Sequence, residues 1–390
     1  MENPTVQDIF HSFYLKYLDR YTPSAEQAKV SHCIMNCKTG AYGANVSVCE
    51  DCGHLQIHYN SCRNRCCPMC QALPTEKWMD AQREDVLEAP YFHVVFTVPQ
   101  ELNPLIYCNQ KLLYDALYHS VSSTINELAE DEKYLGAKVG YICILHTWGS
   151  EMNFHPHIHV ILLGGGLTAK NQWRDKGEEF FFPVKVLSKL FRGKYLDELK
   201  TLWKNKKLHF HGSSEKYRNH YAFKELINIC YEKDWIPHCK KAFNGAQSVI
   251  HYLGKYIHRI AISNRRIIRM DENTVTYYVK DYREAGKWKA LTIPGVEFIR
   301  RFLMHVPPKR FVRIRHYGLL CTRSKTKHLT LCRNLLGCRQ YLSRLKNMET
   351  AQILETLYGI KVSVCKCCGG HLGKPQQRIP CLLYTSPRPR

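Results

Sequence analysis

The chain has 390 residues, 45% of them hydrophobic and 23% charged, an ordinary globular composition with room for two or three domains. Its net charge of +22 is unusual, because 56 lysines and arginines outnumber 34 acidic residues along most of the sequence. A folded protein this basic usually binds a polyanion, and nucleic acid is the first candidate. No apolar run approaches the ~18 residues that span a membrane, and residues 1–20 do not resemble a signal peptide, so we expect a cytoplasmic protein.

The first 38 residues are predicted to form two helices. Ile9, Phe10 and Phe13 recur at helical spacing and are expected in the core, and Ser24 can cap the second helix. A segment rich in cysteine follows these helices.

Two C-x-x-C pairs, Cys49/Cys52 and Cys67/Cys70, stand out in this segment. The chain holds 19 cysteines, and such short spacings indicate metal ligands before disulfides in a protein without a secretion signal. The fourteen residues between the pairs fit a zinc-ribbon loop. We therefore predict that these four thiolates bind one structural Zn²⁺.

The residues between the two pairs add further candidates. Arg63 and Arg65 form a basic patch that could hold DNA phosphates, although a purely structural zinc site without DNA contacts is the alternative. Cys62, Cys66 and Cys37 lie close enough in sequence to change the ligand set or to form an additional zinc site.

The next elements predict the fold class. Residues 76–88 are expected to form a helix, residues 91–98 a strand and residues 112–130 an amphipathic helix, and a β-hairpin follows. This order favours an α+β fold with an antiparallel sheet and helices on one face. His93 lies in the first strand and is a spare candidate for a metal ligand.

The hairpin, residues 139–166, carries the first chemical signal. His157 and His159 point to the same face of a strand, because successive side chains alternate. A turn near residue 151 would place His146 opposite His157, on the same face. Three such imidazoles can hold a divalent metal with open positions, whereas a lone strand histidine is usually only solvated or satisfied in the core.

Residues 246–260 carry the second signal, at helical spacing. Tyr252 and Tyr256 are four residues apart, so their hydroxyls share one face, and clustered cations favour the nucleophilic phenolate. Ordinary packing of two tyrosines is the alternative. The surrounding cations are Lys255, His258, Arg259, Arg265 and Arg266.

The remaining chain gives weaker signals. Helices are expected at residues 186–205 and 297–304, with strands at 274–279 and 287–293, and residues 321–358 look helical and basic. A late cysteine knuckle contains Cys365 and Cys368, which could bind a further zinc. Its partners would come from the upstream cysteines Cys321, Cys332 or Cys338.

Together these motifs resemble the transposases of the insertion-sequence family numbered ninety-one, which are HUH (His-hydrophobic-His) nucleases with an N-terminal zinc-binding domain. The resemblance covers most of the chain. It rests on SCRNRCCPMCQ (61–71), PYFHVVFTVP (90–99), LHTWGSEMNFHPHIHVILLGGG (145–166), YLGKYIHRIAISNRRI (252–267) and EFIRRFLMHVPPKRFVRIRHYGLL (297–320).

The resemblance implies an HUH-type antiparallel sheet with helices, preceded by a small zinc-ribbon-like domain. It implies that His157 and His159 bind Mg²⁺ or Mn²⁺, with His146 resembling the third histidine of related relaxases. Tyr252 and Tyr256 would be the nucleophile pair, nicking and rejoining single-stranded DNA at element ends through a 5′-phosphotyrosine. This is the chemistry of rolling-circle transposition.

Other parts of the chain would assist that reaction. Arg259 and Arg266 are candidates for stabilising the phosphate, and Lys255 for binding DNA. The protein would be bacterial and cytoplasmic, associated with the nucleoid when bound to DNA. The chain departs from the family at Cys66, where the family usually has His, and at Asn45, where His is expected. Both departures concern the zinc ligands and leave the predicted cysteine quartet intact.

Three alternatives remain open from the sequence. A replication initiator or relaxase would use the same chemistry, often with a fused helicase, but the chain has no G-x-x-x-x-G-K-[ST] loop. A non-catalytic zinc-dependent DNA-binding protein would explain the cysteines and the charge, but not the histidine and tyrosine pairs. A zinc hydrolase would use the three histidines without a covalent DNA intermediate.

We predict a helical and zinc-binding domain at residues 1–85, a nuclease domain at 88–300 and a basic C-terminal region at 301–380, which holds the late cysteine cluster. Residues 381–390, CLLYTSPRPR, resemble a translated sequencing adapter. We expect them to be a non-native tail that replaces the natural C-terminus.

Overall fold

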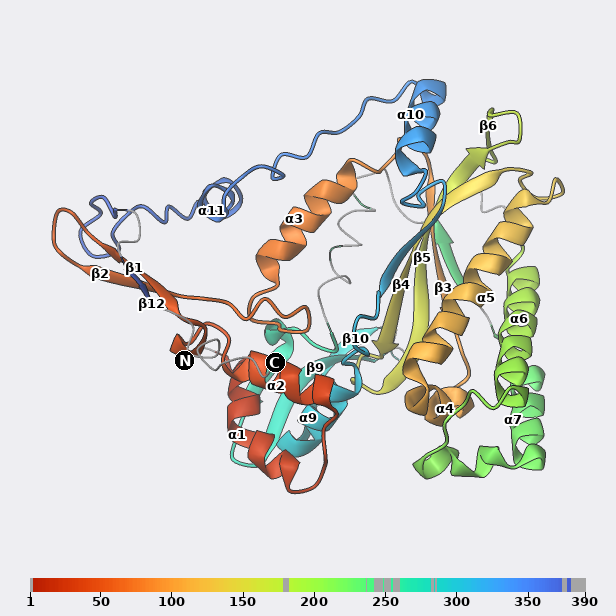
Figure 1. Cartoon of the computed structure of the whole chain (residues 1–390), viewed down its shortest axis with the longest axis horizontal. Coiled ribbons are helices and arrows are strands. Elements are labelled where there is room, and N and C mark those ends of the chain that lie inside the picture. The colour runs from red at the N-terminus through yellow and green to blue at the C-terminus, as the bar shows by residue number, and fades with distance from the viewer. Residues whose placement is uncertain are drawn as a thin grey trace, which may run out of the picture. The chain divides into compact units, whose positions relative to one another are not determined.

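The computed structural model divides into two compact units, and each unit is assembled from separated segments (Figure 1). The first unit combines residues 1–81, 254–306 and 342–390, and the second combines residues 82–253 and 307–341. The domain boundaries expected from the sequence stay a prediction. Each predicted domain is one continuous stretch of sequence, whereas each unit combines several separate stretches. The structure describes residues 3–177, 182–235, 237–241, 248, 254, 260–281, 284, 286–373 and 377–379.

An antiparallel sheet forms the centre of the second unit. Its strand order is β11-β4-β5-β3-β7, with β6 beside β5, so strands far apart in the sequence lie next to each other. Together with the helices below, this confirms the predicted α+β class. The strands are β3 (Tyr91–Thr97), β4 (Lys138–Trp148), β5 (Phe154–Leu167), β6 (Trp173–Asp175), β7 (His238–Lys241) and β11 (Ile314–Gly318).

Helices α5 and α6 lie side by side along one face of this sheet (Figure 1). The core between these helices and the sheet contains every second residue of the strands. Among them are Phe92, Val94 and Phe96 of β3, which are essentially inaccessible to solvent. The intervening residues of each strand therefore point to the opposite face. The helices of this unit are α4 (Asn103–Cys108), α5 (Gln110–Glu130), α6 (Val184–Lys204), α7 (His220–Glu232) and α10 (Lys325–Leu336).

The first unit combines two small sheets with helices. Ser24 caps α2 as predicted, its hydroxyl accepting from the N–H of Gln27 (3.3 Å). Phe302 of α9 meets Phe10 of α1 at 5.4 Å between ring centroids, and Phe298 meets Tyr277 of β9 at 5.7 Å, so α9 packs against both. The elements are α1 (Val6–Leu18), α2 (Ala25–Met35), β1 (Ala44–Val48), β2 (Leu55–Tyr59), α3 (Ala72–Arg83, whose end reaches the second unit), β8 (Ile267–Met270), β9 (Thr274–Asp281), β10 (Lys287–Pro294), α9 (Gly295–Met304), α11 (Thr350–Tyr358) and β12 (Gln377–Ile379).

Three consecutive glycines end β5 where neighbouring chain segments approach it closely. A Cβ on Gly166 would lie 2.4 Å from the carbonyl oxygen of Lys138 in β4, and one on Gly165 would lie 2.4 Å from the ring of Trp173. Backbone cannot yield as a flexible side chain can. These glycines therefore allow β4 and β6 to flank the strand that carries the histidines.

We predict that Gly166→Ala lowers the free energy of unfolding of the second unit by about 1–3 kcal/mol, because the added methyl overpacks against backbone. Gly193→Ala is the matched control, since a Cβ at this α6 position meets nothing within 4 Å. The control should be neutral or stabilising by up to about 1 kcal/mol. Urea unfolding of both variants measures this, and equal midpoints for the two would contradict the close approach.

Candidate active site and metal centres

The hairpin places three histidines together on the face of the sheet that α5 and α6 leave uncovered. β4 and β5 pair with His146 directly opposite His157, which confirms the register predicted from the sequence. His159 lies two residues along β5, on the same face. All three side chains are buried, and the nitrogens they can offer a metal lie within 4.8 Å of one another.

Hydrogen bonds to the ring nitrogens that face away from the cluster orient His157 and His159. His157 donates from Nδ1 to the carbonyl oxygen of His155 (2.7 Å), which leaves its Nε2 facing the Nε2 of His159 at 3.0 Å. The Nδ1 of His159 in turn lies 2.9 Å from the Nε2 of His93. A ring held at one nitrogen presents the lone pair of the other, which is the usual arrangement of metal-binding histidines.

Burial keeps His157 and His159 neutral. Loss of solvent lowers the pKa of His157 to about 3 and the pKa of His159 well below its usual value, and neighbouring histidines lower both further. A neutral imidazole has a free lone pair, whereas an imidazolium has none. The donor set, the orientation and the protonation state therefore all suit a divalent metal.

His93 lies in β3, as predicted, but outside the group of three histidines. The sequence suggested it as a spare ligand, but its ring stacks on His159 (5.1 Å between centroids) outside the three-histidine cluster. Its partner is the outer nitrogen of His159, so it would position a ligand rather than serve as one. The alternation of side chains in β3 could have predicted this position. Phe92 and Val94 face the core, so His93 between them faces the other histidines.

Most of the predicted tyrosine helix lies outside the described residues, including Tyr252, Tyr256, Lys255 and Arg259. Arg266 is described and belongs to the first unit. Its Nε donates to the carbonyl oxygen of Tyr278 (2.8 Å).

Within the described part of the chain, the cysteines form two tetrads, and neither is the predicted quartet. Cys67 and Cys70 lie with two earlier cysteines, and the other C-x-x-C pair lies with cysteines near the C-terminus. The cause is β2, whose five extended residues separate the pairs by on the order of 16 Å. Each tetrad has its sulfurs within 4.8 Å of one another: Cys37, Cys62, Cys67 and Cys70 in the first, and Cys49, Cys52, Cys365 and Cys368 in the second.

Local hydrogen bonds assemble the first tetrad. The N–H of Lys38 donates to the carbonyl oxygen of Asn60 (3.1 Å), which holds Cys37 beside Cys62. The sulfurs of Cys62 and Cys70 are 3.8 Å apart. Four thiolates in such a cluster form a closed, structural zinc site.

Residues around the first tetrad take other roles. Cys66 was a candidate ligand, but it is buried outside both tetrads, and its N–H donates to the Asn64 side chain (2.9 Å). Arg63 and Arg65 are exposed on the loop that carries Cys62.

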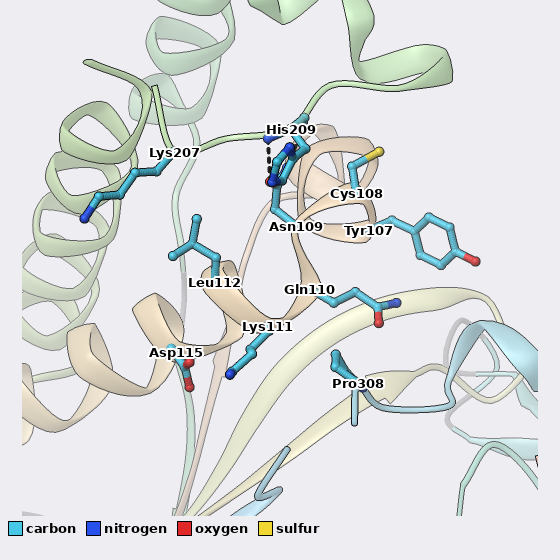
Figure 2. Close-up of a pocket in the computed structure, with 10 residues that line it drawn as sticks. All are labelled: Tyr107, Cys108, Asn109, Gln110, Lys111, Leu112, Asp115, Lys207, His209 and Pro308. Atoms are coloured by element: carbon cyan, nitrogen blue, oxygen red, sulfur yellow. Dashed lines mark hydrogen bonds between the residues drawn. The ribbon is translucent and has the colours of Figure 1, made fainter. Parts of the chain in front are cut away.

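A cavity of about 590 Å³ lies elsewhere in the second unit, at the junction of α4 and α5 (Figure 2). Its lining includes Tyr107 and Lys111 but none of the three clustered histidines. Asn109 donates to the carbonyl oxygen of His209 (2.7 Å) and accepts from its N–H (2.7 Å), as Figure 2 shows in part. The polar groups here join two chain segments, so this cavity is not the candidate active site.

Comparisons with known proteins agree with the motifs. The family described as "Transposase zinc-binding domain" matches residues 9–98, and the family described as "Putative transposase" matches residues 140–328. A Sinorhizobium fredii protein described as "Putative transposase y4qJ" is 39% identical over 86% of this chain and 84% of its own length. The chain belongs to the IS91 family of transposases. The "Transposase for insertion sequence element IS801" of Pseudomonas savastanoi pv. phaseolicola is 28% identical, over 74% of this chain and 69% of its own length.

Among solved structures, the conjugative relaxase TrwC in complex with oriT DNA matches this transposase family member weakly. Its copper-bound structure is 12% identical with a TM-score of 0.26, over 65% of this chain and 95% of that one. Its metal-bound structure is 13% identical with a TM-score of 0.25, over 66% and 96%. Likeness at this level supports no further argument. No helix in the described part of the chain is long and apolar enough to cross a membrane.

We predict that His93→Ala raises the metal concentration needed for half-maximal binding by about 10–100-fold, because His159 loses the partner of its outer nitrogen. His93→Gln should restore much of the affinity, since its amide oxygen can accept the same hydrogen bond. Titration with Mn²⁺, followed by electron paramagnetic resonance, measures this. Unchanged affinity in His93→Ala would show that His93 does not position the ligand.

Proposed function

We propose that this chain is a transposase that nicks and rejoins single-stranded DNA by a metal-dependent tyrosine transesterification. The observation that carries the proposal is the buried cluster of His146, His157 and His159, because its donors converge at one point. Membership of the IS91 family supports the same function. The net charge of +22 suits a nucleic-acid substrate.

The three histidines would hold the catalytic metal. When bound, a divalent ion polarises the scissile phosphate and offsets its charge. Of the two predicted ions, Mn²⁺ suits this site better than Mg²⁺, because imidazole nitrogens suit the softer ion and Mg²⁺ prefers oxygen. Three protein ligands also leave positions open for phosphate oxygens, as in catalytic rather than structural sites.

The tyrosines would perform the transfer. The hydroxyl oxygen of Tyr252 or Tyr256 forms a bond to phosphorus, the bond from phosphorus to the 3′ oxygen breaks, and the phenol proton ends on that oxygen. The products are a 5′-phosphotyrosine and a free 3′-hydroxyl, so the number of phosphoester bonds is conserved and no nucleotide cofactor is needed. The second tyrosine can then cut or receive the other end. Arg259 and Arg266 are proposed to stabilise the phosphate.

The zinc-binding part would recognise the element ends. Arg63 and Arg65 are exposed on a loop stapled by the first cysteine tetrad, which fits contact with DNA phosphates. Lys255 is proposed as a further DNA contact next to the tyrosines. A replication initiator or relaxase would share the chemistry and differ in the DNA site it recognises.

We predict that the full chain, mixed with labelled single-stranded DNA of an element end and Mn²⁺, forms a covalent adduct that survives denaturation. His157→Ala should reduce the adduct by about 100-fold or more, because one of three metal ligands is lost. The Tyr252→Phe, Tyr256→Phe double variant should abolish it, because no nucleophile remains. Denaturing gel electrophoresis gives the yield.

His119→Ala is the control, since this exposed histidine of α5 pairs with Glu198 (3.0 Å) and lies outside the cluster. It should form adduct at the rate of the unchanged chain. DNA binding without an adduct would contradict the proposal and indicate a non-catalytic DNA-binding protein. DNA hydrolysis without an adduct would contradict it too and indicate a metal hydrolase.

A further inference from the structure

Two C-x-x-C-G segments from opposite ends of the sequence face each other in the first unit, and their backbones are folded alike. In each, the N–H of the first cysteine donates to the carbonyl oxygen five residues later: Cys49 to His54 (2.9 Å) and Cys365 to Gly370 (2.8 Å). The glycine after each pair donates back to the carbonyl of the first cysteine (3.0 Å in both) and adopts a positive φ, 71° in one and 77° in the other. Such matched turns present two sulfurs each toward a common point.

The four sulfurs do converge. Cys49 Sγ lies 3.5 Å from Cys368 Sγ, and Cys52 Sγ lies 3.8 Å from Cys365 Sγ. Backbone N–H groups of the C-terminal segment donate to the sulfurs of both its cysteines at 3.4 Å. Each of these two cysteines is therefore held in place by a backbone donor of its own turn.

Among the described residues, the other contacts between the two segments are few. The buried cluster at this point consists of Cys49, Cys365 and Leu372. The described part of β12 pairs with β1 over three residues, Ala44–Val46 with Gln377–Ile379, and at the exposed edge the N–H of Glu50 donates to the carbonyl oxygen of His371 (3.1 Å). A three-residue strand and three buried side chains do not form a stable core in water, and small folds of this kind use a metal instead.

We propose that Cys49, Cys52, Cys365 and Cys368 bind one Zn²⁺ that clasps the C-terminal segment to the β1–β2 hairpin. Four thiolates select zinc. The two matched families end at residues 98 and 328, so neither reaches the C-terminal half of this site. The clasp is independent of the proposed nuclease chemistry.

The clasp joins residues up to 319 positions apart in the sequence. Since the site forms only when both segments meet, zinc binding and docking of the C-terminal segment are one equilibrium. Loss of this zinc should therefore release the chain after Gly359, where α11 ends, while the first tetrad keeps its own zinc.

The test measures zinc per chain by native mass spectrometry on the full-length protein. The unchanged chain should carry two zinc ions at the cysteine tetrads, and Cys368→Ser should carry one. Cys367→Ser is the matched control, because this exposed thiol lies between the two ligands but outside the tetrad. It should keep both. Limited proteolysis should cut the C-terminal segment at least tenfold faster in Cys368→Ser than in Cys367→Ser.

Cys368→His covers the case in which Cys368→Ser disturbs the whole unit, because imidazole is also a zinc ligand. It should keep the second zinc and the protection from proteolysis. Equal zinc content in the unchanged chain and Cys368→Ser would overturn the clasp. The clasp would also be overturned if Cys368→His and Cys367→Ser both lost this zinc. The loss of zinc would then not depend on whether the substituted residue is a metal ligand.

A second, independent observation concerns the β10-β9-β8 sheet of the first unit. α9 packs on one face, where Tyr277 meets Phe298. On the other face, Tyr278 and Lys280 of β9 stand opposite Ala290 and Trp288 of β10. The side chains of Tyr278 and Trp288 are 45% and 55% exposed, so two large aromatic rings stand on an open sheet surface.

Cations flank these rings. The Nζ of Lys280 lies 5.2 Å and the guanidinium of Arg266 lies 5.8 Å from the ring centroid of Trp288. The exposed side chain of Arg269 reaches the hydroxyl of Thr276 on the same face (3.4 Å). Aromatic rings with flanking cations on an open sheet are the surface that single-stranded nucleic acids use, since bases stack and phosphates pair with the cations.

We infer that this sheet face binds a single strand of DNA, with neighbouring bases stacked on Trp288 and Tyr278. The two residues are diagonal neighbours on paired strands, a relation that places Cα atoms about 7–8 Å apart. The sheet begins at Ile267, shortly after the predicted tyrosine pair in the sequence. This inference rests on the proposed function.

The test measures binding of a fluorescent single-stranded oligonucleotide by anisotropy, without added metal, so that cleavage plays no part. Trp288→Ala should weaken binding about tenfold, and Trp288→Phe should retain most of it, because stacking needs only an aromatic face. Lys280→Gln should make the binding constant fall less steeply with salt concentration, by the amount expected for the loss of about one phosphate contact. Tyr221→Ala is the control, since Tyr221 is 81% exposed on α7 of the other unit.

The outcomes separate the two proposals. If the unchanged chain binds no single-stranded DNA, the proposed function fails. If it binds and Trp288→Ala binds equally well, only the sheet surface is overturned.

Discussion

The alternation of side chains in three neighbouring strands is the constraint on which the candidate site depends. In β3, β4 and β5 one set of residues packs against α5 and α6, and the other set carries the histidines. The apolar face fixes the register, because a slip of one residue would turn every imidazole into the core. The position of the histidine cluster is thus set by packing on the opposite side of the sheet. Glycine at the end of β5 keeps the flanking strands close enough for that register to persist.

The same packing sets the protonation of the cluster. Burial lowers the pKa of His157 and His159, so both stay neutral where free histidine begins to take up protons. Protonated imidazoles so close together would repel one another and could not bind a cation. The unfolded chain takes up protons near pH 6.5 and the folded cluster does not, so acid favours the unfolded state below that pH. A bound metal opposes this by occupying the lone pairs in the folded state alone.

How far the sequence predicts the structure depends on the range of the interactions. The hairpin register, the cap at Ser24 and the face shared by His146 and His157 follow from local patterns, and each is found. α7 was not predicted, although Asn219 caps it through bonds to the N–H groups of Tyr221 and Ala222, which is a local signal.

Contacts between residues far apart in the chain could not be predicted from local sequence patterns. β11 joins the sheet at β4, yet all five of its residues are half-buried, so no alternation marks it as a strand. The cysteine tetrads were misassigned because C-x-x-C spacing shows which residues form a turn, but not which turn it will meet. Cys52 meets Cys365 across 313 positions, a pairing set by tertiary structure. Local chemistry was therefore predictable, and the choice of partners was not.

The two units carry different kinds of candidate metal site, cysteine tetrads in the first and a histidine cluster in the second. Four thiolates fill a tetrahedral shell, so the cysteine tetrads suit zinc that holds chain segments and offers no place to a substrate. Three imidazoles leave positions open, so the histidine cluster suits an ion that must also touch a phosphate. Softness separates the ions as well, because thiolate selects zinc and would bind Mn²⁺ or Mg²⁺ poorly. A chain with both donor types can hold a permanent structural metal at its cysteines and, for the proposed strand transfer, an exchangeable one at its histidines.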